Sequence, residues 1–502
     1  MSAPRGRVWL VGAGPGDPGL LTRKGARAIA ECEVLVYDYL ASPAIVAMAP
    51  PNCEKIYVGK KADAHTMPQD EITALIVKLG LAGKRVVRLK GGDVFVFARG
   101  GEEAAELRAA GVPFEIVPGI TSAIAAPAYA GIPITHRDHN TSFTIATGHE
   151  DPTKGYSSLD FAKLANPAQT LVFLMAMGSL GGIVAKLREH GMPGEIPVAV
   201  VREGTKPAQA TIVATLDTIV AEVERTRFAA PAIVVIGNVV AEREAIRWFD
   251  TNPLFGKRVL VTRAREASLD LAEQFWEIGA EPVLAPTIAI GPPDDVTGAR
   301  AATAAFASYA WVVFTSQNGV NAAFSYLAER GADARAFGSA KVAAVGPKTA
   351  ALLAARGIVA DFVPGKFDAD EVAAGVLARS TAGDRVLFYG AQEMRQGPAG
   401  ALRAGRRHVD VVAAYKTNPL FDPDIARAAR ETDIWTFTSA STVNAFVANV
   451  PDAAELARER IVACIGPVTA DAASAAGLPA DVVAEEFTAR GLVDALERIA
   501  VS

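Results

Sequence analysis

The chain has 502 residues, of which 50% are hydrophobic and 21% charged, and its formal net charge is −5 at pH 7. The length predicts about three or four domains, and the acidic balance excludes a global positive field that would recruit nucleic acid. Cys32, Cys53 and Cys464 form no CxxC pair, so we expect neither disulfides nor a metal site. We expect a cytoplasmic protein with no membrane partner, because no apolar leader or membrane-length apolar run is present.

The first predicted strand, residues 7–12, runs into a turn that contains Gly14, Gly16 and Gly19. Asp17 and Pro18 suit the start of a helix that continues over 20–29, and a second strand, 34–37, ends in Asp38. Residues 14–19 match G-x-G-x-x-G and Asp38 follows about 20 residues on, which is the pattern of a nicotinamide-dinucleotide site. Pro18 stands where such a site needs backbone N–H groups, and this counts against that interpretation.

The strand 85–90 and the loop after it form the most informative stretch of the chain. Val86 and Val87 indicate a buried strand, and residues 104–110 predict a helix. Gly91 and Gly92 lie between the two, at the carboxyl end of the strand, where open α/β sheets bind small molecules. Paired glycines let a ligand approach the backbone, so the sequence favours a ligand-binding role for Asp93 over a plain capping role.

The remaining segments of the first 250 residues continue the alternation of strands and helices. A helix over 69–79 and a strand over 114–117 complete a mostly parallel sheet within residues 5–137. A second part, 138–250, contains strands at 170–175, 197–201 and 232–240, a turn at 203–205 and a helical tail at 242–248. Residues 251–257 are expected to be a linker.

The C-terminal half, 258–502, contains an internal repeat. Residues 311–322 are echoed by 434–445, and 344–350 are echoed by 464–470. Each copy predicts a strand, a turn with hydroxyl side chains, a helix, a strand, a Gly-Pro turn and a helix. We therefore expect two similar α/β lobes with parallel sheets, about 258–284 with 416–502 and about 290–412, whose crossings lie at 281–286 and 411–416.

Several motifs stand in order along the first half: VGAGPGD (11–17), RLKGGD (88–93), RGGEE (99–103), VPGITS (117–122), AYAGIPITHR (128–137) and TGH (147–149). By these motifs residues 1–250 resemble the uroporphyrinogen-III C-methyltransferases of the tetrapyrrole methylase family. Residues 259–263, 313–320 and 437–443 and the two Gly-Pro-x-Thr-Ala turns resemble uroporphyrinogen-III synthase. The implied fold is α/β: a two-domain tetrapyrrole methylase followed by a two-lobed synthase.

The resemblance implies two successive reactions. Hydroxymethylbilane is closed to uroporphyrinogen III, and methyl groups then pass from S-adenosyl-L-methionine to C2 and C7, which gives precorrin-2 on the way to sirohaem or cobalamin. S-adenosyl-L-homocysteine is the implied by-product, no metal is required, and the methyltransferase half implies a homodimer.

The resemblance also implies site residues for methyl transfer. The implied cofactor contacts are Pro15, Gly91, Gly92, Asp93, Val96, Thr121, Ser122, Met175, Gly204, Thr205, Pro231 and Ala232. Asp38 is the candidate general base and Lys60 the candidate proton donor or substrate anchor, with a helix cap and a solvated lysine as the alternatives. Arg99 and Arg137 are candidates to bind substrate carboxylates, with ion pairs as the alternative. Core packing is the alternative for Met175.

The synthase half offers hydroxyl side chains near predicted helix starts, where N–H groups and the helix dipole favour anions. The candidate substrate contacts are Thr315, Ser316, Thr349, Thr438, Ser439 and Thr469, and plain N-capping is the alternative. Tyr415 is the candidate to assist loss of the hydroxyl group, with packing as its alternative. A C-terminal half that only binds or senses tetrapyrroles is a further alternative.

The sequence departs from the commonest family pattern at Lys61, Asp63, Val94, Ala98 and Ala176. Ala98 matters most if its position needs a positive φ, because a Cβ costs roughly 1 kcal/mol there. These departures bear on affinity and rate more than on the type of reaction.

Overall fold

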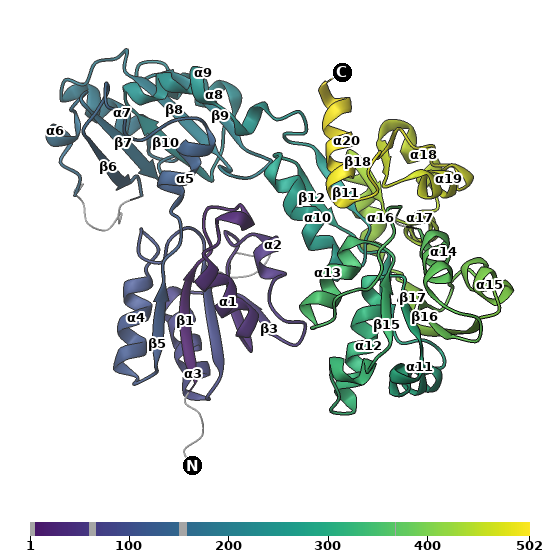
Figure 1. Cartoon of the computed structure of the whole chain (residues 1–502). Helices are drawn as coiled ribbons and strands as arrows, with labels where there is room; N and C mark the ends of the chain where they lie inside the picture. Colours follow the sequence, from purple (N-terminus) through teal and green to yellow (C-terminus); the bar gives the residue numbers. More distant parts are fainter. Residues whose placement is uncertain (1–5, 60–66, 150–157, 367, 502) are drawn as a thin grey trace.

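The computed structural model describes residues 6–59, 67–149, 158–366 and 368–501. Within these residues the chain builds four five-stranded sheets, two in each half, and helices pack against them (Figure 1). The expected α/β class is confirmed, since three of the four sheets are wholly or mostly parallel. No helix among the described residues is long and apolar enough to cross a membrane.

The first sheet is entirely parallel and has the order β3-β2-β4-β1-β5. Its strands are β1 (Arg7–Gly12), β2 (Val34–Tyr37), β3 (Glu54–Tyr57), β4 (Arg85–Lys90) and β5 (Phe114–Val117), and its helical segments are η1 (Pro18–Leu20), α1 (Arg23–Glu31), α2 (Pro43–Val46), α3 (Gln69–Leu81) and α4 (Gly100–Ala109). The chain leaves β1 toward β2 and leaves β4 toward β5, in opposite directions. The carboxyl ends of β1 and β4 therefore form the topological switch point of the sheet, the usual place for a ligand.

The helix expected over 20–29 begins later than the sequence predicts. Asp17 caps only the 3-10 turn η1, by accepting a hydrogen bond from the Gly19 N–H at 2.7 Å. Helix α1 starts at Arg23 behind its own cap, Thr22, whose hydroxyl accepts from the Gly25 N–H at 3.1 Å. The glycine turn is thus not followed directly by a long helix.

The second sheet is mixed, with the order β6-β7-β10-β8-β9, and only β6 and β7 run parallel. Its strands are β6 (Ser142–Thr147), β7 (Gln169–Leu174), β8 (Pro197–Arg202), β9 (Ala210–Thr215) and β10 (Ala232–Ile236). The helical segments are α5 (Ser122–Tyr129), α6 (Phe161–Leu164), α7 (Leu180–Glu189), α8 (Ile219–Thr226), η3 (Asn238–Glu242), α9 (Arg243–Ile246) and η4 (Phe249–Thr251). Strand β9 was not predicted. The strand predicted over 232–240 ends earlier, at Ile236, because Gly237 ends it and η3 follows.

The third sheet is parallel and joins two distant segments of the chain, in the order β12-β11-β18-β19-β20. Its strands are β11 (Arg258–Val261), β12 (Glu281–Leu284), β18 (Ile434–Phe437), β19 (Ile461–Cys464) and β20 (Val482–Val483). The helical segments are α10 (Arg265–Glu277), α16 (Pro423–Arg430), α17 (Ala440–Asn449), α18 (Ala453–Leu456), η7 (Ala457–Glu459), α19 (Pro467–Ala475) and α20 (Ala489–Val501).

The fourth sheet has the order β13-β17-β16-β14-β15, and only β13 is antiparallel to its neighbour. Its strands are β13 (Ile288–Gly291), β14 (Trp311–Phe314), β15 (Lys341–Ala344), β16 (Arg385–Ala391) and β17 (His408–Pro419). The helical segments are α11 (Val296–Ala304), η5 (Phe306–Ser308), α12 (Gln317–Glu329), η6 (Ala334–Phe337), α13 (Pro347–Ala355), α14 (Ala369–Arg379) and α15 (Gly397–Ala404).

The two copies of the repeat form the same succession of elements in the third and fourth sheets. One copy is β14, α12, β15 and α13, and the other is β18, α17, β19 and α19. The first crossing lies at 285–287, between β12 and β13, and overlaps the expected 281–286, although 281–284 belong to β12. The second crossing follows the end of β17, where Ile288 pairs with Pro419, and not 411–416, which lie inside β17.

Candidate active site

A cavity of about 530 Å³ opens at the switch point of the first sheet and extends to the second sheet. It is lined by the residues that follow β1, β2 and β4, by the start of α5, and by the ends and turns of β7, β8 and β10. Eleven of the twelve predicted cofactor contacts line it: Pro15, Gly91, Gly92, Asp93, Val96, Thr121, Ser122, Met175, Gly204, Pro231 and Ala232. The structure therefore brings together residues that are up to about 200 positions apart in the sequence.

Two glycine turns are joined to each other at this cavity. The Gly92 N–H donates to the Gly14 carbonyl at 2.7 Å, and the Gly14 N–H donates to the Gly92 carbonyl at 3.1 Å. Gly92 adopts φ +69°, and an added Cβ would meet nothing closer than 3.9 Å. Glycine is therefore favoured at this position by the backbone conformation, and the space where a Cβ would stand is open to the cavity.

Asp93 uses its carboxylate to hold the loop itself. One oxygen accepts from the N–H groups of Phe95 at 2.8 Å and Val96 at 3.2 Å, and the other accepts from the Gly119 N–H at 3.0 Å. Asp93 thus links the loop after β4 to the segment that leads from β5 into α5. Any contact with a ligand would add to this structural role.

A network of charged side chains lies beneath the cavity. Arg88 donates to Asp38 Oδ2 at 3.1 Å and to Glu103 Oε1 at 3.3 Å, and Lys90 donates to the same Glu103 oxygen at 2.9 Å. Gln69 adds a further donor to that oxygen at 2.9 Å. Arg88, Lys90 and Glu103 are almost fully buried, whereas the Asp38 side chain keeps 22% of its exposure.

The charges in this network are unevenly satisfied. Burial and the neighbouring Arg88 lower the pKa of Lys90, and Glu103 offsets part of this effect. Within the described residues, no donor reaches Glu103 Oε2, although that atom is buried. Asp38 alone among the carboxylates of the network both contacts Arg88 and lines the cavity.

The other predicted polar residues of this half differ in position. Arg99 lines the cavity and forms a two-pronged pair with Glu102, with N–O distances of 2.9 and 2.6 Å. Arg137 is exposed on the loop before β6 and is not part of the cavity lining. Lys60, with Lys61 and Asp63, lies outside the described residues.

Strained backbone is concentrated around the cavity. Seven non-glycine residues of the described chain have a positive φ, and four of them, Phe97, Arg99, Met175 and Glu203, line the cavity. Ala98 is not among the seven, so its Cβ does not add the free-energy cost of a positive φ. Positive φ at such residues costs free energy and persists where the surrounding structure fixes it, which is common at binding sites.

The predicted contact Thr205 lies behind the cavity and joins the two sheets of this half. Its buried hydroxyl accepts a hydrogen bond from the Asp17 N–H at 3.2 Å. Asp17 also accepts from the Tyr129 hydroxyl at 2.6 Å, and Gln209 bonds to both the Thr205 N–H and the Tyr129 carbonyl. These contacts fix the glycine turn of the first sheet against the turn that follows β8.

In the C-terminal half the two hydroxyl turns are helix caps. Ser316 caps α12 by accepting from the Gly319 N–H at 3.1 Å, and Ser439 caps α17 with a reciprocal Thr442 bond. The Ser316 hydroxyl also lies 2.9 Å from the hydroxyl of Tyr415, whose pKa is raised by burial. The structure therefore joins one predicted substrate contact to the predicted catalytic tyrosine.

The remaining candidates of that half are dispersed. Thr315 lines a smaller cavity of about 250 Å³ together with Phe388 and Met394. Thr349 and Thr469 are buried in the first turns of α13 and α19, and Thr438 is half-buried at the end of β18. Across the lobes, Lys348 at the start of α13 approaches Asp270 of α10 at 3.6 Å.

Arg88, Lys90 and Glu103 were not among the predicted site residues. A signal was present, because Arg88 and Lys90 stand two apart in a strand that reads as buried, on the same face. Charged side chains in such a place are rare unless they are paired.

The described fold and its cavity define an α/β enzyme with a small-molecule site in its first half. Residues 7–220 match the family described as tetrapyrrole (corrin/porphyrin) methylases, and residues 269–494 match uroporphyrinogen-III synthase HemD. The porphyrin biosynthesis protein HemD of Ruminiclostridium josui is 40% identical over 499 residues, which is 98% of each chain. The chain belongs to this family, in which a tetrapyrrole methylase is fused to a uroporphyrinogen-III synthase.

Two further relatives match only the N-terminal half. An S-adenosyl-L-methionine-dependent uroporphyrinogen III methyltransferase of Methanosarcina barkeri is 52% identical, over 48% of this chain and 94% of that protein. The crystal structure of a uroporphyrin-III C-methyl transferase from Thermus thermophilus, complexed with S-adenyl homocysteine, is 38% identical, with a TM-score of 0.41 over 47% of this chain and 99% of that one.

Proposed function

We propose that the chain catalyses two consecutive steps of tetrapyrrole biosynthesis. The C-terminal half converts hydroxymethylbilane to uroporphyrinogen III, and the N-terminal half transfers methyl groups from S-adenosyl-L-methionine to C2 and C7, which gives precorrin-2. The observation that carries the proposal is the cavity at the carboxyl ends of β1 and β4, which gathers eleven of the residues expected to hold the cofactor.

The volume and the lining of this cavity suit a sulfonium nucleoside. Its volume of about 530 Å³ lies within the usual range for a small-molecule site. The open side of Gly92 and the main chain around it offer backbone donors and acceptors, while Met175, half exposed on the wall, offers an apolar face to a flat base. S-adenosyl-L-methionine supplies an activated methyl group when bound, and the rigid walls supply orientation.

Asp38 is the proposed proton acceptor of methyl transfer. Its Oδ2 accepts a hydrogen bond from buried Arg88, and its Oδ1 accepts from the Leu40 N–H at 3.1 Å, so the carboxylate is held in one orientation at the cavity wall. The proton that the methylated macrocycle loses passes to this carboxylate. Lys60 is proposed to donate a proton or to anchor the substrate.

Arg99 is proposed to bind a carboxylate of the macrocycle at the cavity mouth. Its guanidinium already holds the Glu102 carboxylate with two hydrogen bonds, which shows that it can present a two-pronged surface there. Both side chains are more than half exposed, so exchanging Glu102 for a substrate carboxylate costs little. Arg137, which is away from the cavity, is not assigned to this step.

Tyr415 is the proposed proton donor for hydroxyl loss in the synthase half. Burial raises its pKa, so the phenol keeps its proton at neutral pH and can protonate the departing hydroxyl, which leaves as water. The bond to Ser316 places the phenol beside the N-terminus of α12, where free N–H groups favour the substrate carboxylates. The other hydroxyl candidates, Thr315, Thr349, Thr438, Ser439 and Thr469, are proposed substrate contacts in the same half.

The cofactor assignment is tested by comparing two ligands in thermal unfolding. S-adenosyl-L-homocysteine at a hundred times its dissociation constant is expected to stabilise the N-terminal half by about 2.7 kcal/mol, and NAD is expected to have no effect. Stabilisation by NAD instead would contradict the assignment.

The synthase assignment is tested separately, with hydroxymethylbilane alone. We expect the intact chain to give uroporphyrinogen III without any methyl donor. Formation of the type I isomer only would leave the C-terminal half as a binding or regulatory module. The chain is further proposed to form a homodimer through its N-terminal half, and light scattering during size-exclusion chromatography would measure its mass.

A further inference from the structure

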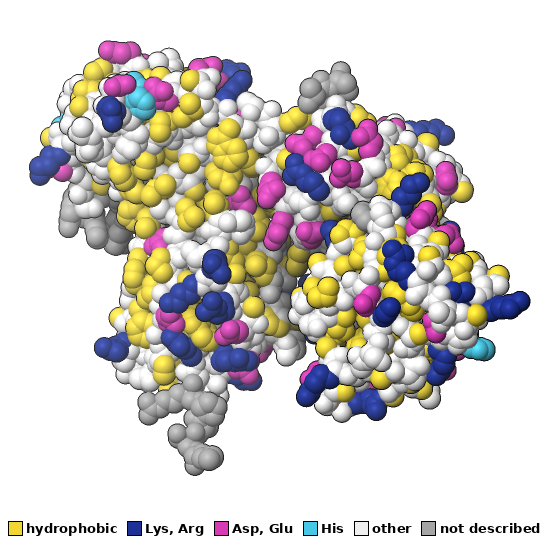
Figure 2. Space-filling view, viewed as in Figure 1, with side chains coloured by type: hydrophobic (Ala, Val, Ile, Leu, Met, Phe, Trp, Pro, Cys, Tyr) yellow, Lys and Arg dark blue, Asp and Glu magenta, His cyan; other side chains and the backbone are white. Residues whose placement is uncertain are grey.

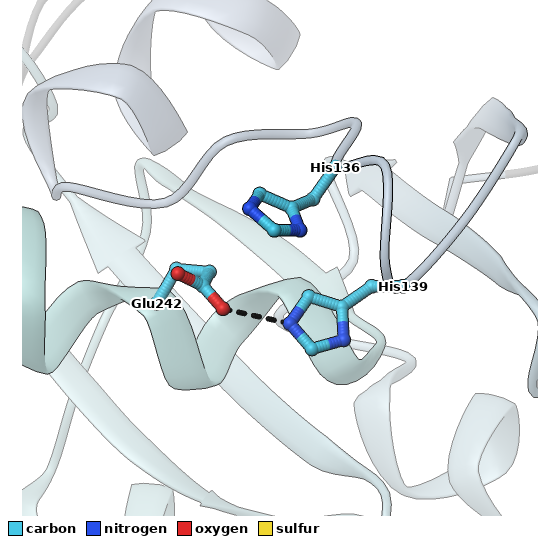
Figure 3. A group of neighbouring side chains, drawn as sticks. All are labelled: His136, His139 and Glu242. Carbon is cyan, nitrogen blue, oxygen red and sulfur yellow. Dashed lines mark hydrogen bonds and ion pairs between the residues drawn. The ribbon is translucent and has the colours of Figure 1, made fainter.

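Three side chains outside the cavity converge at the end of the second sheet where β6 begins and β10 ends. His136 and His139 lie on the loop between α5 and β6, and Glu242 is the last residue of η3, more than a hundred positions later in the chain. One nitrogen of each histidine and one oxygen of Glu242 all lie within 4.8 Å of one another. Figure 3 shows the two rings on one loop, facing the carboxylate on the helical segment below.

The loop that carries both histidines is held in place by a buried residue. Asn140 accepts a hydrogen bond from the His136 N–H at 2.8 Å, and its amide donates to the carbonyls of Ile134 and Ser142. The same amide contacts Thr170 of β7 at 3.1 Å. The backbone of the loop is thus fixed to the sheet before any ligand is added.

The backbone at Glu242 is also fixed by packing. The residues before it in η3, Val239 and Val240, are buried in the core of the second sheet. The Glu242 carboxylate meets His139 Nε2 at 2.7 Å, and the side chains of His136, His139 and Glu242 keep between about a quarter and a third of their exposure. The three groups are therefore rigidly presented and reachable from solvent.

We propose that His136, His139 and Glu242 form a binding site for a divalent transition-metal ion of the Zn²⁺ type. Two imidazole nitrogens and one carboxylate oxygen are a common set of zinc ligands, and water completes the coordination. Ligands at about 2.0–2.1 Å from a tetrahedral ion lie roughly 3.4 Å apart, so the side chains need only small rotations to close on it. Where His139 binds the ion through Nε2, a proton on that nitrogen moves to Nδ1 or to water.

The simpler account, an ion pair of His139 and Glu242 alone, does not explain the third member. The His136 ring lies with its centroid 4.9 Å from that of His139 at an angle of 36°. Its Nδ1 has two long contacts, with the Asp138 N–H at 3.3 Å and with Asp138 Oδ2 at 4.0 Å, so ligation through either ring nitrogen gives up only weak interactions. The sequence predicted no metal site, because the spacing of the histidines says nothing of Glu242.

The ion would stabilise this end of the second sheet. None of its three ligands lines the cavity, so the site is separate from the proposed methyl-transfer site and does not depend on it. Binding would tie the loop that enters β6 to the segment that leaves β10. The expected effect is a higher melting temperature of the chain.

The test is calorimetric titration of the tag-free, EDTA-treated chain with Zn²⁺, supported by the visible absorption of the Co²⁺ form. We expect one equivalent to bind and the melting temperature to rise. His139→Gln keeps an N–H donor toward Glu242 but lacks the imidazole ligand, so it should weaken binding at least tenfold. His190→Gln is the matched control, because His190 is an exposed histidine at the C-cap of α7 whose ring contacts the Lys186 carbonyl and is not a member of the cluster, and this variant should bind as the parent does.

Glu242→Gln provides a second variant and should also weaken binding at least tenfold. Each variant is first compared with the parent in EDTA, where equal melting temperatures show that the fold is intact. The proposal is overturned if no stoichiometric Zn²⁺ binds. It is equally overturned if both variants bind like the parent, since the ion would then lie elsewhere.

Discussion

Arg88 and Glu103 decide how Asp38 faces the cavity. Arg88 is 3% exposed and divides its donors between the two carboxylates, while Glu103 is fully buried. Removing one partner from such a buried pair leaves the other charge uncompensated, which costs several kcal/mol. The residues that look least available to a ligand therefore keep the proposed base in position.

Asp38→Asn tests that role. The amide keeps the size of the side chain but cannot accept a proton, so we expect methyl transfer to slow by about 10²–10⁴-fold while binding of S-adenosyl-L-homocysteine is retained. The measurement is single-turnover methylation of uroporphyrinogen III. Glu33→Gln, which removes an exposed acid paired with Arg85, is the control and should leave the rate unchanged.

Tyr415→Phe tests the proposed proton donor of the synthase half. The ring still fills its buried place, but the bond to Ser316 is lost, and we expect cyclisation to slow by about 10²-fold or more. Tyr309→Phe, which removes a hydroxyl bonded to Asp410 in the same lobe, should have little effect. Equal rates for the two variants would assign Tyr415 to packing.

The pH dependence of the same step follows from burial. The raised pKa of Tyr415 means that the phenol still carries its proton above pH 9, because its ordinary value is about 10. The folded state favours the protonated phenol, so this contribution to stability is present below pH 10 and is lost as the pH rises through the folded pKa. Cyclisation by the parent should therefore not decline between pH 7 and 9 through this group.

At this scale the sequence indicates which residues bear chemistry but not how they pair. RLKGGD and RGGEE name Arg88, Lys90, Glu102 and Glu103, yet only the structure shows that Glu103 is buried in the network and Glu102 is exposed beside Arg99. Adjacent residues on a helix point in different directions, and the pairing of Arg88 with Asp38 requires β2 beside β4. Local sequence patterns do not predict the order of the strands in a sheet.

Among the elements, the turns determine the site more than the strands do. The loop after β4 combines a Gly92 bridge to Gly14, the Asp93 bonds to three N–H groups and positive φ at Phe97 and Arg99. The strands themselves were predictable, because β-branched runs such as Val86-Val87 indicate buried strands. Strand β9 was not predicted because its sequence, ATIVAT, does not alternate clearly between apolar and polar residues, and in the structure nearly all of its residues are half-buried.

Gly92→Ala tests the importance of this loop. A Cβ at φ +69° costs about 1–2 kcal/mol, and the altered turn should weaken binding of S-adenosyl-L-homocysteine. Gly101→Ala is the matched control, since Gly101 lies in helix α4 and an added Cβ meets nothing within 4 Å. Calorimetric titration of both variants measures the difference. Equal affinities would show that the conformation of Gly92 does not shape the site.

For the molecule as a whole, each half is built from two five-stranded sheets, but the strand order and direction differ between the sheets. Figure 2 shows hydrophobic side chains gathered on the visible face of the second sheet's part of the N-terminal half, Lys and Arg side chains gathered over the first sheet, and charged groups of both signs over the C-terminal half. The sequence repeat predicted two matching lobes in the C-terminal half, and the copies do form matching elements. The mixed second sheet and the positions of the crossings depend on which distant strands pair, and local sequence patterns do not predict that pairing.

The joint between the first two sheets shows why the cavity needs the whole first half. Asp17, Tyr129, Thr205 and Gln209 connect the glycine turn after β1 to the turn after β8. Both turns contribute walls to the cavity. Neither sheet would form the site without the other.

The central claim is that one chain closes and then methylates the same macrocycle. The direct measurement is incubation of the intact chain with hydroxymethylbilane and S-adenosyl-L-methionine, followed by mass and absorption analysis of the tetrapyrrole. The account predicts a type III macrocycle that carries two added methyl groups. A product that is the type I isomer, or one without added methyl groups, would contradict it.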